Sequence, residues 1–461
     1  MLLRIARLAL LLLITAVVVW ALVLGWWQSS EHAPTTSESL LYLIALPLAV
    51  FGGFVLLHGF IHGLRNPPEP KPADTAATDT APAAHADAAA RQLQLSIVAH
   101  ALVTAAGNDA ASVIMAAQAG KAPKPDDELK DGDGLAVPAA RVKGLDPSAF
   151  TDAVDAFADA HAWPASLLRS IALADQVLTD ILAAMHETLD ASPDLSAELR
   201  LDWVLDHPLD EAAREVIGRW LNETHLATFA PRHCHTQLHC ATDDVGALQL
   251  IDSLSLGLNR ETTPTIAIVL SSASNIDETR IAGWHAEGRL FSTQQQHGQI
   301  PGEAAAAVAL TTVDTAEQLG LDAPVRVSRI NAHRRDKPAD AGGKISAALC
   351  AQLCTDLLRV SNIAPGAVAA LASDCDHRAT RQAEALGVID ESFEGLEPSQ
   401  DYAPLGTVCG SAAPAAALVA LLCATETALE KNAPVLALSV QHPGLRAAAL
   451  LQASPPSDST S

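Results

Sequence analysis

Two long apolar segments stand in the N-terminal part of the chain. Residues 8–27 contain no charged side chain, and residues 40–57 form a second uncharged run after a short polar loop. Each run is long enough for a helix to cross the hydrocarbon core of a bilayer, which takes about 20 residues. The first run is also longer than the apolar core of a signal peptide, and no clean cleavage site follows it. The pattern therefore predicts a transmembrane hairpin over residues 1–66.

The charges that flank the two predicted spans indicate their orientation. Arg4 and Arg7 precede the first span, Arg65 and Lys71 follow the second, and the loop between the spans has no Lys or Arg. Positively charged flanks favour the cytoplasmic side of a membrane. We therefore expect a protein of the bacterial inner membrane, with both termini and the large remaining domain in the cytoplasm.

Two segments have the composition of disordered chain. Residues 67–90 are rich in Pro, Ala, Thr and Asp and show no hydrophobic periodicity, which predicts an extended linker. Residues 454–461 predict a disordered tail for the same reason. A globular domain is expected over residues 91–453, between these two segments.

Short runs with strand propensity alternate with helical patterns in this domain. The expected strands are residues 93–99, 235–240, 265–270, 304–310, 325–330, 368–372 and 435–440. The expected helices are residues 110–119, 167–185, 210–221, 245–258, 345–358, 379–386 and 412–430. This alternation predicts an α/β fold with a sheet buried on both faces.

The order of several short motifs resembles the β-ketoacyl synthases. Residues 95–109 (LSIVAHALVTAAGND) are similar to their first strand and glycine turn, and residues 288–310 (GRLFSTQQQHGQIPGEAAAAVAL) are similar to their "RPFD…RDGFVPGEGAAVLVL" segment. Residues 341–376 and 402–440 resemble two later segments of that family, in the family's order. The resemblance implies a thiolase-like domain of α/β/α/β/α layers, without a cofactor, that pairs into a homodimer.

The resemblance also indicates where a catalytic cysteine would stand. Condensing enzymes of this fold use a thiolate on a tight turn between a strand and a helix. Cys240 matches that place, as the vestigial nucleophile candidate. Asp243 and Asp244 follow it where the family has small residues, and carboxylates so close would oppose thiolate formation.

Both histidines of the condensing family are replaced at the corresponding places. The "HGTGT" loop is replaced by SDCDHRATRQAEA, in which His377 does not match the motif. The later "GHT.GAAG" sequence is replaced by VCGSAAPAAA, with Cys409 and Gly410 at the place of the histidine. The usual oxyanion and decarboxylation roles are thereby lost, which predicts a catalytically inactive ketosynthase-like protein.

Residues 233–240 (HCHTQLHC) hold the densest group of potential metal ligands. On a strand, His233, His235 and His239 would point to one face, while Cys234 and Cys240 would point to the other. Neither face offers the four ligands of a tetrahedral zinc site. Ordinary edge-strand histidines are therefore the preferred interpretation, and a zinc or copper site is the alternative.

One basic run interrupts the acidic sequence. Residues 329–337 (RINAHRRDK) carry Arg329, Arg334, Arg335 and Lys337, which are candidates for docking an anionic partner. The alternative is an ordinary solvated loop.

Composition limits the classes of partner. The formal net charge is −24, which argues against nucleic acid, because binding to phosphates depends on a basic surface. The 7 cysteines are an odd number and fit a reducing cytoplasm.

Three functional hypotheses follow. The first is a membrane-anchored, catalytically inactive adapter or scaffold that binds a protein partner. The overall layout and a segment near residue 130 are also similar to the adapter proteins of type VI secretion lipase clusters, which would imply a secreted effector as that partner. The second hypothesis is an acyl-transfer or condensing enzyme that uses Cys240. The third is a metal-responsive membrane sensor.

Overall fold

The computed structural model describes residues 20, 23, 26, 89–158, 163–190, 197–229 and 233–454. The chain divides into two compact units, Met1–Thr80 and Ala81–Ser461, and the second contains every element described below. Apart from residues 20, 23 and 26, the two predicted spans lie outside the described residues, as does almost all of the predicted linker and tail. No helix within the described part of the chain is long and apolar enough to cross a bilayer.

Most strands of the second unit belong to one mixed sheet of 11 strands, in the order β11-β10-β12-β13-β8-β1-β7-β6-β4-β5, with β9 paired to β13. These strands are β1 (Gln94–Thr104), β4 (Glu198–Leu205), β5 (Cys234–Cys240), β6 (Thr265–Ser274), β7 (Glu303–Thr312), β8 (Val325–Ser328), β9 (Asn331–Arg334), β10 (Ala370–Ser373), β11 (Tyr402–Pro404), β12 (Val435–Ser439) and β13 (Leu445–Ala453). A separate hairpin joins β2 (Pro125–Lys130) to β3 (Ala136–Pro138).

The sheet consists of two halves with the same internal topology. In the first half β5, β4 and β6 are parallel, β7 is antiparallel to β6, and β1 is antiparallel to β7. In the second half β11, β10 and β12 are parallel, β13 is antiparallel to β12, and β8 is antiparallel to β13. The halves meet where β1 pairs antiparallel with β8, from Leu95 opposite Val327 to Ile97 opposite Val325.

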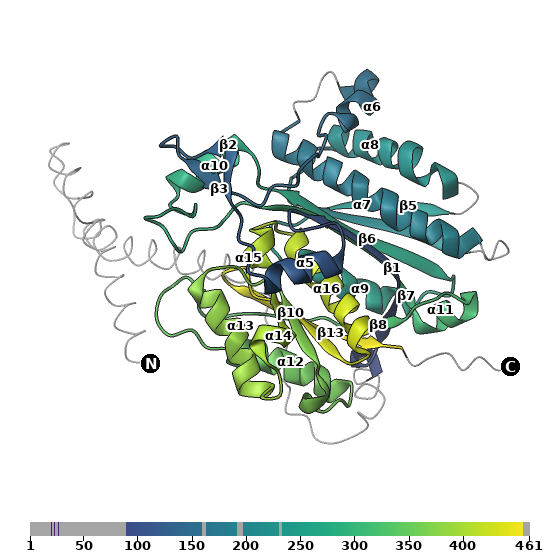
Figure 1. The fold of residues 1–461 in the computed structure, drawn as a ribbon. Coiled ribbons are helices and arrows are strands. Elements are labelled where there is room, and N and C mark those ends of the chain that lie inside the picture. The colour runs from purple at the N-terminus through teal and green to yellow at the C-terminus, as the bar shows by residue number, and fades with distance from the viewer. Residues whose placement is uncertain are drawn as a thin grey trace, which may run out of the picture. The chain divides into compact units, whose positions relative to one another are not determined.

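Helices cover both halves and also fill the space between them (Figure 1). They are α5 (Ala110–Gln118), α6 (Ala149–Ala158), α7 (Ala165–Asp190), α8 (Glu211–Trp220), α9 (Gly246–Leu258), α10 (Glu278–Ala286), α11 (Val313–Leu319), α12 (Ala348–Val360), α13 (Ala379–Ser392), α14 (Pro398–Asp401), α15 (Gly406–Cys409) and α16 (Ala415–Lys431). A π-helical turn, Leu221–Leu226, continues α8.

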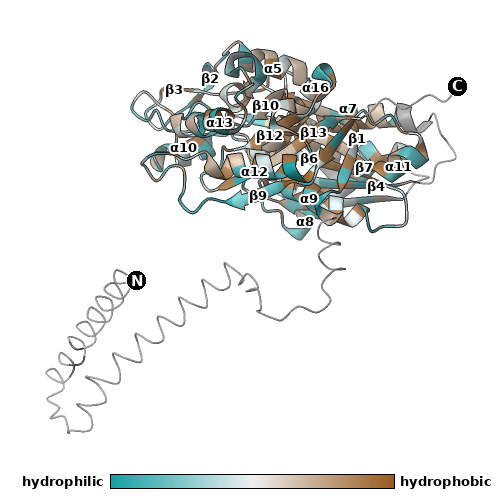
Figure 2. Cartoon of the chain, turned by 90° about the horizontal axis from the view of Figure 1, so that it is seen from below, coloured by the Kyte–Doolittle hydropathy of each residue, from teal (hydrophilic) through white to brown (hydrophobic). Residues whose placement is uncertain are grey.

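Three hydrophobic cores separate these helices into layers. One core joins α7 and α8 to the outer face of the first half-sheet, and another joins α12 and α13 to the outer face of the second. The central core holds α9 and α16 between the inner faces of both halves. The order of layers is thus α/β/α/β/α, as the sequence predicted, and apolar residues concentrate on the inner elements (Figure 2).

The size of the side chains explains how a helix fits between two sheets. On β12, Ala437 faces the central core, whereas Leu436 and Leu438 face α12 and α13. Helix α16 is buried on nearly every side and is rich in alanine, as expected of a helix without a solvent-facing stripe. Small residues on both elements allow the helix axis to approach the strands closely.

Two central strands were absent from the sequence-based prediction. The sequence of β4, ELRLDWVL, contains Arg200 and Asp202, which break its apolar pattern. The structure buries Asp202 and pairs it with Arg200 Nε at 2.6 Å and with His239 Nε2 at 2.7 Å. The sequence of β13, LRAAALLQA, likewise contains Arg446, whose guanidinium is buried against Glu384 at 2.7 Å. The charged residues break the apolar pattern by which a strand is predicted, and ion pairs offset the free-energy cost of burying them.

Candidate functional site

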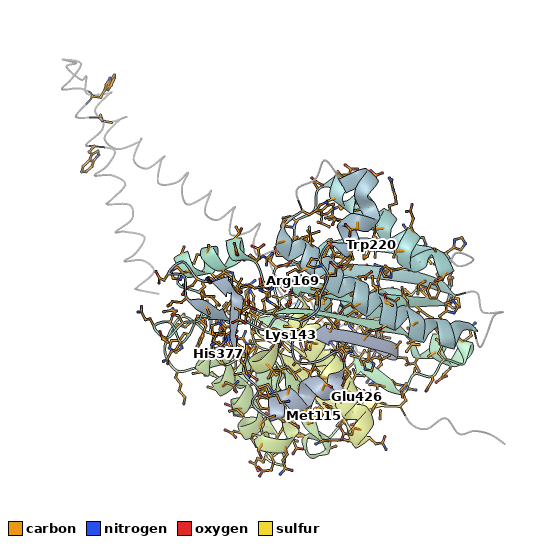
Figure 3. The ribbon with its side chains drawn as sticks, turned by 45° about the horizontal axis from the view of Figure 1, so that its top comes forward. Met115, Lys143, Arg169, Trp220, His377 and Glu426 are labelled. Atoms are coloured by element: carbon orange, nitrogen blue, oxygen red, sulfur yellow. The ribbon has the colours of Figure 1, made fainter. Side chains whose placement is uncertain are left out.

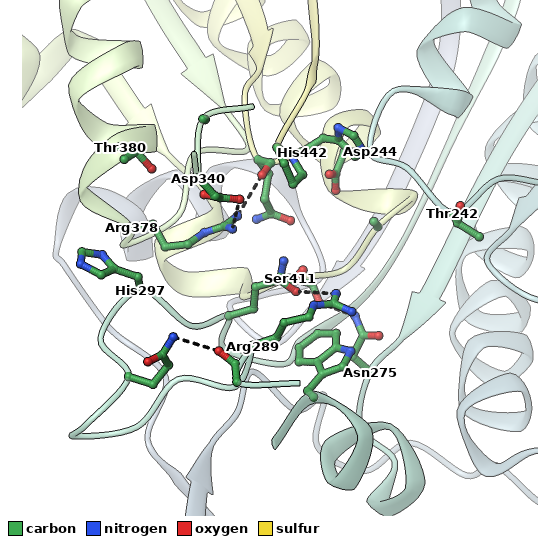
Figure 4. Close-up of a pocket in the computed structure, with 18 of the residues that line it drawn as sticks. Thr242, Asp244, Asn275, Arg289, His297, Asp340, Arg378, Thr380, Ser411 and His442 are labelled. Atoms are coloured by element: carbon green, nitrogen blue, oxygen red, sulfur yellow. Dashed lines mark hydrogen bonds and ion pairs between the residues drawn. The ribbon is translucent and has the colours of Figure 1, made fainter. Parts of the chain in front are cut away.

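A polar cavity of about 960 Å³ opens where the two half-sheets meet (Figure 4). Its lining comes from the ends of strands and the starts of helices in both halves, and includes Asp206, Thr242, Asp244, Asn275, Arg280, Arg289, His297, Asp340, Arg378, Ser411, Gln441 and His442. Ligands of α/β proteins commonly bind outside the carboxyl ends of parallel strands. The location and the polar lining make this cavity the candidate functional site.

Asp244 lies at the start of α9, close to the junction of the layers. Asp244 is only 5% exposed, and its Oδ1 atom has no hydrogen-bond partner among the described residues. Burial, followed by the negative charge of Asp374, raises the pKa of Asp244 to about 8. Desolvation penalises the ionised form of a carboxyl group. Asp244 is therefore a protonated acid at neutral pH.

Asp374 follows β10 and approaches Asp244 from the second half of the fold. Its carboxyl group accepts hydrogen bonds from Ser439 Oγ at 2.5 Å, from the Val440 amide at 2.7 Å and from the Gln441 amide at 3.2 Å. Burial raises the pKa of Asp374 to about 6, although these hydrogen bonds stabilise the charged form. At neutral pH Asp374 therefore carries the charge, and Asp244 carries the proton.

Gln441 and His442 follow β12 and line the same cavity. Gln441 Nε2 donates to the carbonyl oxygens of Asp374, at 3.1 Å, and Gly410, at 3.3 Å. These two bonds orient the amide and leave Gln441 Oε1 buried without a partner among the described residues. His442 Nδ1 accepts from the amides of Gly444 and Leu445 at 2.9 Å, and burial lowers the pKa of His442. The ring is thus neutral at pH 7, with its proton on Nε2.

Arg378 fixes the loop that replaces the histidine motif. Its Nε donates to Asp376 Oδ2 at 2.8 Å, and its Nη2 donates to the Gln441 carbonyl at 2.9 Å. His377 instead packs edge-on against Phe291, with the ring centroids 4.9 Å apart, and burial lowers the pKa of His377. Arg378 lines the cavity and His377 does not.

A second polar network forms the opposite wall. Arg280 donates to Asp206 Oδ2 at 2.5 Å and to Asn275 Oδ1 at 2.8 Å. Asn275 Nδ2 donates to the Ser411 carbonyl at 2.6 Å, so this wall ties the first half of the fold to the loop before α16. His207 Nδ1 lies 2.6 Å from Asp206. The positive charge of Arg280 and the negative charge of Asp206 therefore offset each other in this wall.

Gly302 and Glu303, which match a motif of the resembled family, have structural roles. Glu303 is fully buried and accepts from Arg169 Nε at 2.8 Å, from Ser274 Oγ at 2.7 Å and from the Val142 amide at 2.7 Å. Arg169 belongs to α7 (Figure 3), and its Nη2 lies 2.6 Å from Glu303 Oε1. A Cβ atom on Gly302 would overlap the carbonyl oxygen of Cys409. The pair therefore holds the loop beside the cavity in place.

Cys240 lies at the last position of β5 and is exposed, and it does not line the cavity. Thr242 and Asp244 line it instead. Cys409 stands near the place of a family histidine but is buried, and burial raises its pKa to about 12. Burial also raises the pKa of Cys375. No cysteine is among the described residues that line the cavity.

The basic residues of 329–337 do not form a free patch. Arg329 Nε pairs with Asp252 at 2.6 Å, Arg335 pairs with the buried Glu384, and Lys337 Nζ donates to the Gly342 carbonyl at 2.8 Å. Arg334 is exposed at the end of β9. Docking of an anionic partner by this run stays a prediction, with Arg334 and Lys337 as its exposed members.

The three strand histidines are not gathered into a ligand group. His239 bonds to Asp202 at 2.7 Å, and His233 and His235 are exposed. Within the described residues, the side chains close enough to hold one metal ion together are Asp131, Asp133 and His285, on a different part of the fold.

Several residues of the cavity escaped the sequence-based search. The sequence alone marked four carboxylates as unfavourable for a condensing site, namely Asp243, Asp244, Asp374 and Asp376. No sequence motif indicated Gln441 or the network around Arg280. Only their positions could have indicated a site, because these residues follow strands or begin helices, where ligands of α/β proteins commonly bind.

No protein-family model and no curated protein matches the chain. Solved structures match its fold. The ketosynthase from module 6 of the bacillaene synthase from Bacillus subtilis 168 has a TM-score of 0.57 at 11% identity, over 79% of this chain and 72% of that chain.

Two other structures are similar over their whole length. The ishigamide ketosynthase/chain length factor has a TM-score of 0.54 at 16% identity and covers 78% of this chain and 100% of that chain. A chain of the complex of a type II PKS acyl-carrier protein with its ketosynthase bound to the hexaketide has a TM-score of 0.54 at 12% identity, over 79% and 100%. The described α/β unit thus has the thiolase-like fold of the ketosynthases.

Proposed function

We propose that this protein is a non-condensing, ketosynthase-like binding protein that acts as an adapter or scaffold. The observation that carries the proposal is Asp244, a buried carboxyl group in the cavity with a pKa raised to about 8 by burial and by Asp374. Thiolate chemistry needs a nearby positive charge or a helix N-terminus free of carboxylates. Among the described residues, no cysteine lines this cavity, and Asp244 places a carboxyl group directly before α9.

The alternative function, acyl transfer by Cys240, has less support. The fold is compatible with it, but the Cys240 thiol is exposed at a strand end and does not line the cavity. An acyl group on this thiol would lie away from the cavity, without the residues that would bind its chain or its oxyanion. A metal-responsive sensor has less support still, because His239 is engaged by Asp202.

The proposed partner is a protein. A solved neighbour of the same fold is a ketosynthase in complex with an acyl-carrier protein, which supports protein binding as a use of such a surface. The similarity to type VI secretion adapters makes a secreted effector the first candidate. The apolar runs at residues 8–27 and 40–57 support anchoring in a bacterial inner membrane, with the large domain in the cytoplasm.

A homodimer is part of the proposal. Strand β5 stands at the end of the sheet order and pairs on one side with β4, which leaves its other edge available among the described strands. Exposed edges of this kind favour pairing with another strand. Light scattering of the full chain in detergent, corrected for bound detergent, would show a dimer, and a monomer at all concentrations would refute this part.

The test of the non-condensing function is acyl loading. The purified full chain is incubated with acetyl-CoA and malonyl-CoA, and its intact mass and its cysteine-containing peptides are measured. The expected result is that no cysteine is acylated faster than an exposed thiol of a denatured control. A stoichiometric acyl adduct on Cys240, absent in Cys240→Ser, would overturn the proposal in favour of acyl transfer.

A further inference from the structure

The two ends of the large sheet differ in how they are protected against pairing. Strand β11 ends the sheet on one side, has 3 residues and contains Pro404, which has no backbone N–H to donate. Strand β5 ends the sheet on the other side, has 7 residues and contains no Pro, Lys, Arg, Asp or Glu. Proteins commonly protect sheet edges with short strands, Pro and charged side chains. Among the described strands, β5 is therefore the sheet end that is open to pairing.

The hydrogen bonds of β5 show which of its residues face the open edge. The His233 carbonyl accepts from the Leu199 amide at 2.9 Å, and the Ala241 amide donates to the Leu205 carbonyl at 2.9 Å. Successive residues of a strand direct their backbone groups to opposite sides. The backbone groups of residues 233, 235, 237, 239 and 241 therefore point toward β4. Those of residues 234, 236, 238 and 240 point toward the open edge.

One backbone group at this edge has a side-chain partner. The exposed Arg214 donates from Nη1 to the Leu238 carbonyl oxygen at 2.8 Å. This bond agrees with a Leu238 carbonyl that points away from β4. A carbonyl oxygen has two lone pairs, so it can also accept from the amide of an added strand. Arg214 therefore leaves the edge able to pair.

The sequence of β5 is nearly palindromic. In CHTQLHC, Cys stands at both ends, His stands next to each Cys, and Gln237 lies at the centre. Two identical strands that pair antiparallel about a two-fold axis place each residue opposite its mirror position, as in any isologous interface. With the axis at Gln237, the whole strand pairs, each Cys lies opposite a Cys, and each His lies opposite a His. The strand also carries no Asp, Glu, Lys or Arg that would be repelled by its own copy.

We propose that two copies of the chain pair through β5 about a two-fold axis at Gln237, and that Cys234 of each copy and the partner's Cys240 form a thiol pair that oxidation closes to an intersubunit disulfide. The inference rests on the homodimer of the proposed function, to which it adds a register and a covalent site. The site needs both copies, because Cys234 and Cys240 of one strand are separated by about 20 Å.

The geometry of an antiparallel pair suits a disulfide at these positions. Because the backbone groups of Cys234 and Cys240 face the open edge, each of these residues forms a hydrogen-bonded pair with its opposite, in which the Cα atoms are about 5.5 Å apart. Disulfides span Cα separations of about 4.4–6.8 Å. Residues directly opposite each other lie on the same face of a sheet. A register that moved the opposite residue two positions along would displace it by about 7 Å, which is too far for the bond.

The oxidant in the proposed step is a small-molecule disulfide, for which oxidised glutathione serves. The thiolate of the exposed Cys240 attacks one sulfur of oxidised glutathione, releases one glutathione thiol and forms a mixed disulfide. The thiolate of the partner's Cys234 then attacks the Cys240 sulfur and releases the second glutathione thiol. Two protein thiols are thus oxidised, one oxidised glutathione is reduced, and both protons end on glutathione. In a reducing compartment the pair stays as two thiols.

The first measurement is covalent dimer formation by the natural full chain. The chain is purified in detergent, incubated with oxidised glutathione, and analysed by denaturing gel electrophoresis without reductant. We expect a covalent dimer that dithiothreitol returns to monomer. The other five cysteines are buried and remain in every variant, so they do not account for differences between variants.

Two variants and their mixture test the register. In Cys234→Ser and in Cys240→Ser, every remaining edge cysteine lies opposite a serine, so we expect each variant alone to lose the covalent dimer. When the two variants are co-expressed with different tags, the mixed dimer brings Cys240 of one chain opposite Cys234 of the other. We expect this mixed dimer to recover the covalent bond. A covalent dimer in either single variant at the level of the natural chain, or no covalent mixed dimer, would overturn the register and the site.

The outcomes separate this inference from the proposed function. Light scattering of the same samples reports whether the chain is a dimer. A dimer that forms no covalent bond overturns the thiol pair and leaves the homodimer intact, whereas a monomer overturns both. Acyl loading of Cys240 overturns the non-condensing function whatever the result of oxidation.

Discussion

Asp244 and Asp374 come from opposite halves of the fold, and the charge of the buried Asp374 acts on the buried carboxyl group of Asp244, which lines the cavity. Burial and the charge of Asp374 raise the pKa of Asp244 to about 8, whereas backbone and Ser439 hydrogen bonds keep the pKa of Asp374 lower, at about 6. Of the two acids, Asp244 therefore holds its proton to the higher pH. The predictions that follow concern this pair and the framework around it.

The first prediction concerns the pH dependence of stability. The pKa of Asp244 in the folded protein is about 8, against an ordinary value of 3.8, so the folded state binds the proton more tightly than the unfolded chain. The stabilising contribution is present below the ordinary value and is lost as the pH rises toward 8. We expect the melting temperature of Asp244→Asn to rise relative to that of the natural chain between about pH 5 and about pH 8.

Calorimetry of the two full-length proteins across this range measures that effect. Asp243→Asn is again the control, and its difference from the natural chain should change less with pH. A constant difference between Asp244→Asn and the natural chain would show that Asp244 ionises normally.

The second prediction concerns the framework at Glu303. Replacing the fully buried Glu303 by Gln leaves the Arg169 guanidinium, whose side chain is 13% exposed, without its counter-charge, which is expected to cost about 3–5 kcal/mol of unfolding free energy. Glu287→Gln, which breaks an exposed pair with Arg289, should cost about 0–1 kcal/mol. Denaturant unfolding of both variants measures the contrast. Equal losses would mean that the buried pair contributes no more than a surface pair.

The third prediction concerns thiol reactivity. Cys240 is exposed, whereas Cys350, Cys354, Cys375, Cys409 and Cys423 are buried. A thiol-alkylating reagent should modify Cys240 before any of these five, and Cys240→Ser should remove that fast step. Peptide mass spectrometry over time identifies the site. Faster modification of any of the five buried thiols than of Cys240 would contradict this prediction.

Much of the fold was predictable from the sequence because the strands that are buried on both faces are apolar throughout. Residues 265–270 and 304–310 were expected as strands and lie within β6 and β7, and residues 379–386 lie within α13. The layered α/β architecture and the order of motifs followed from such segments. Strand β4 was missed because Arg200 and Asp202 interrupt its pattern, and only the tertiary pairing with His239 explains their burial.

The candidate site was less predictable, because its character depends on distant residues. The sequence indicated that Asp244 disfavours a thiolate, but its effect depends on Asp374, far along the chain. The amide of Gln441 becomes an isolated acceptor only because two carbonyl groups hold its nitrogen. The basic residues of 329–337 suggested a docking surface, but Asp252 and Glu384 neutralise Arg329 and Arg335.

The most direct test of the account is the protonation state of Asp244. An infrared difference spectrum between the natural chain and Asp244→Asn at neutral pH isolates the absorption of this one carboxyl group. We predict the C=O stretch of a protonated acid, which disappears as the pH is raised above about 8. A difference spectrum with carboxylate bands alone at neutral pH would contradict the account, because the cavity would then hold a second ionised acid.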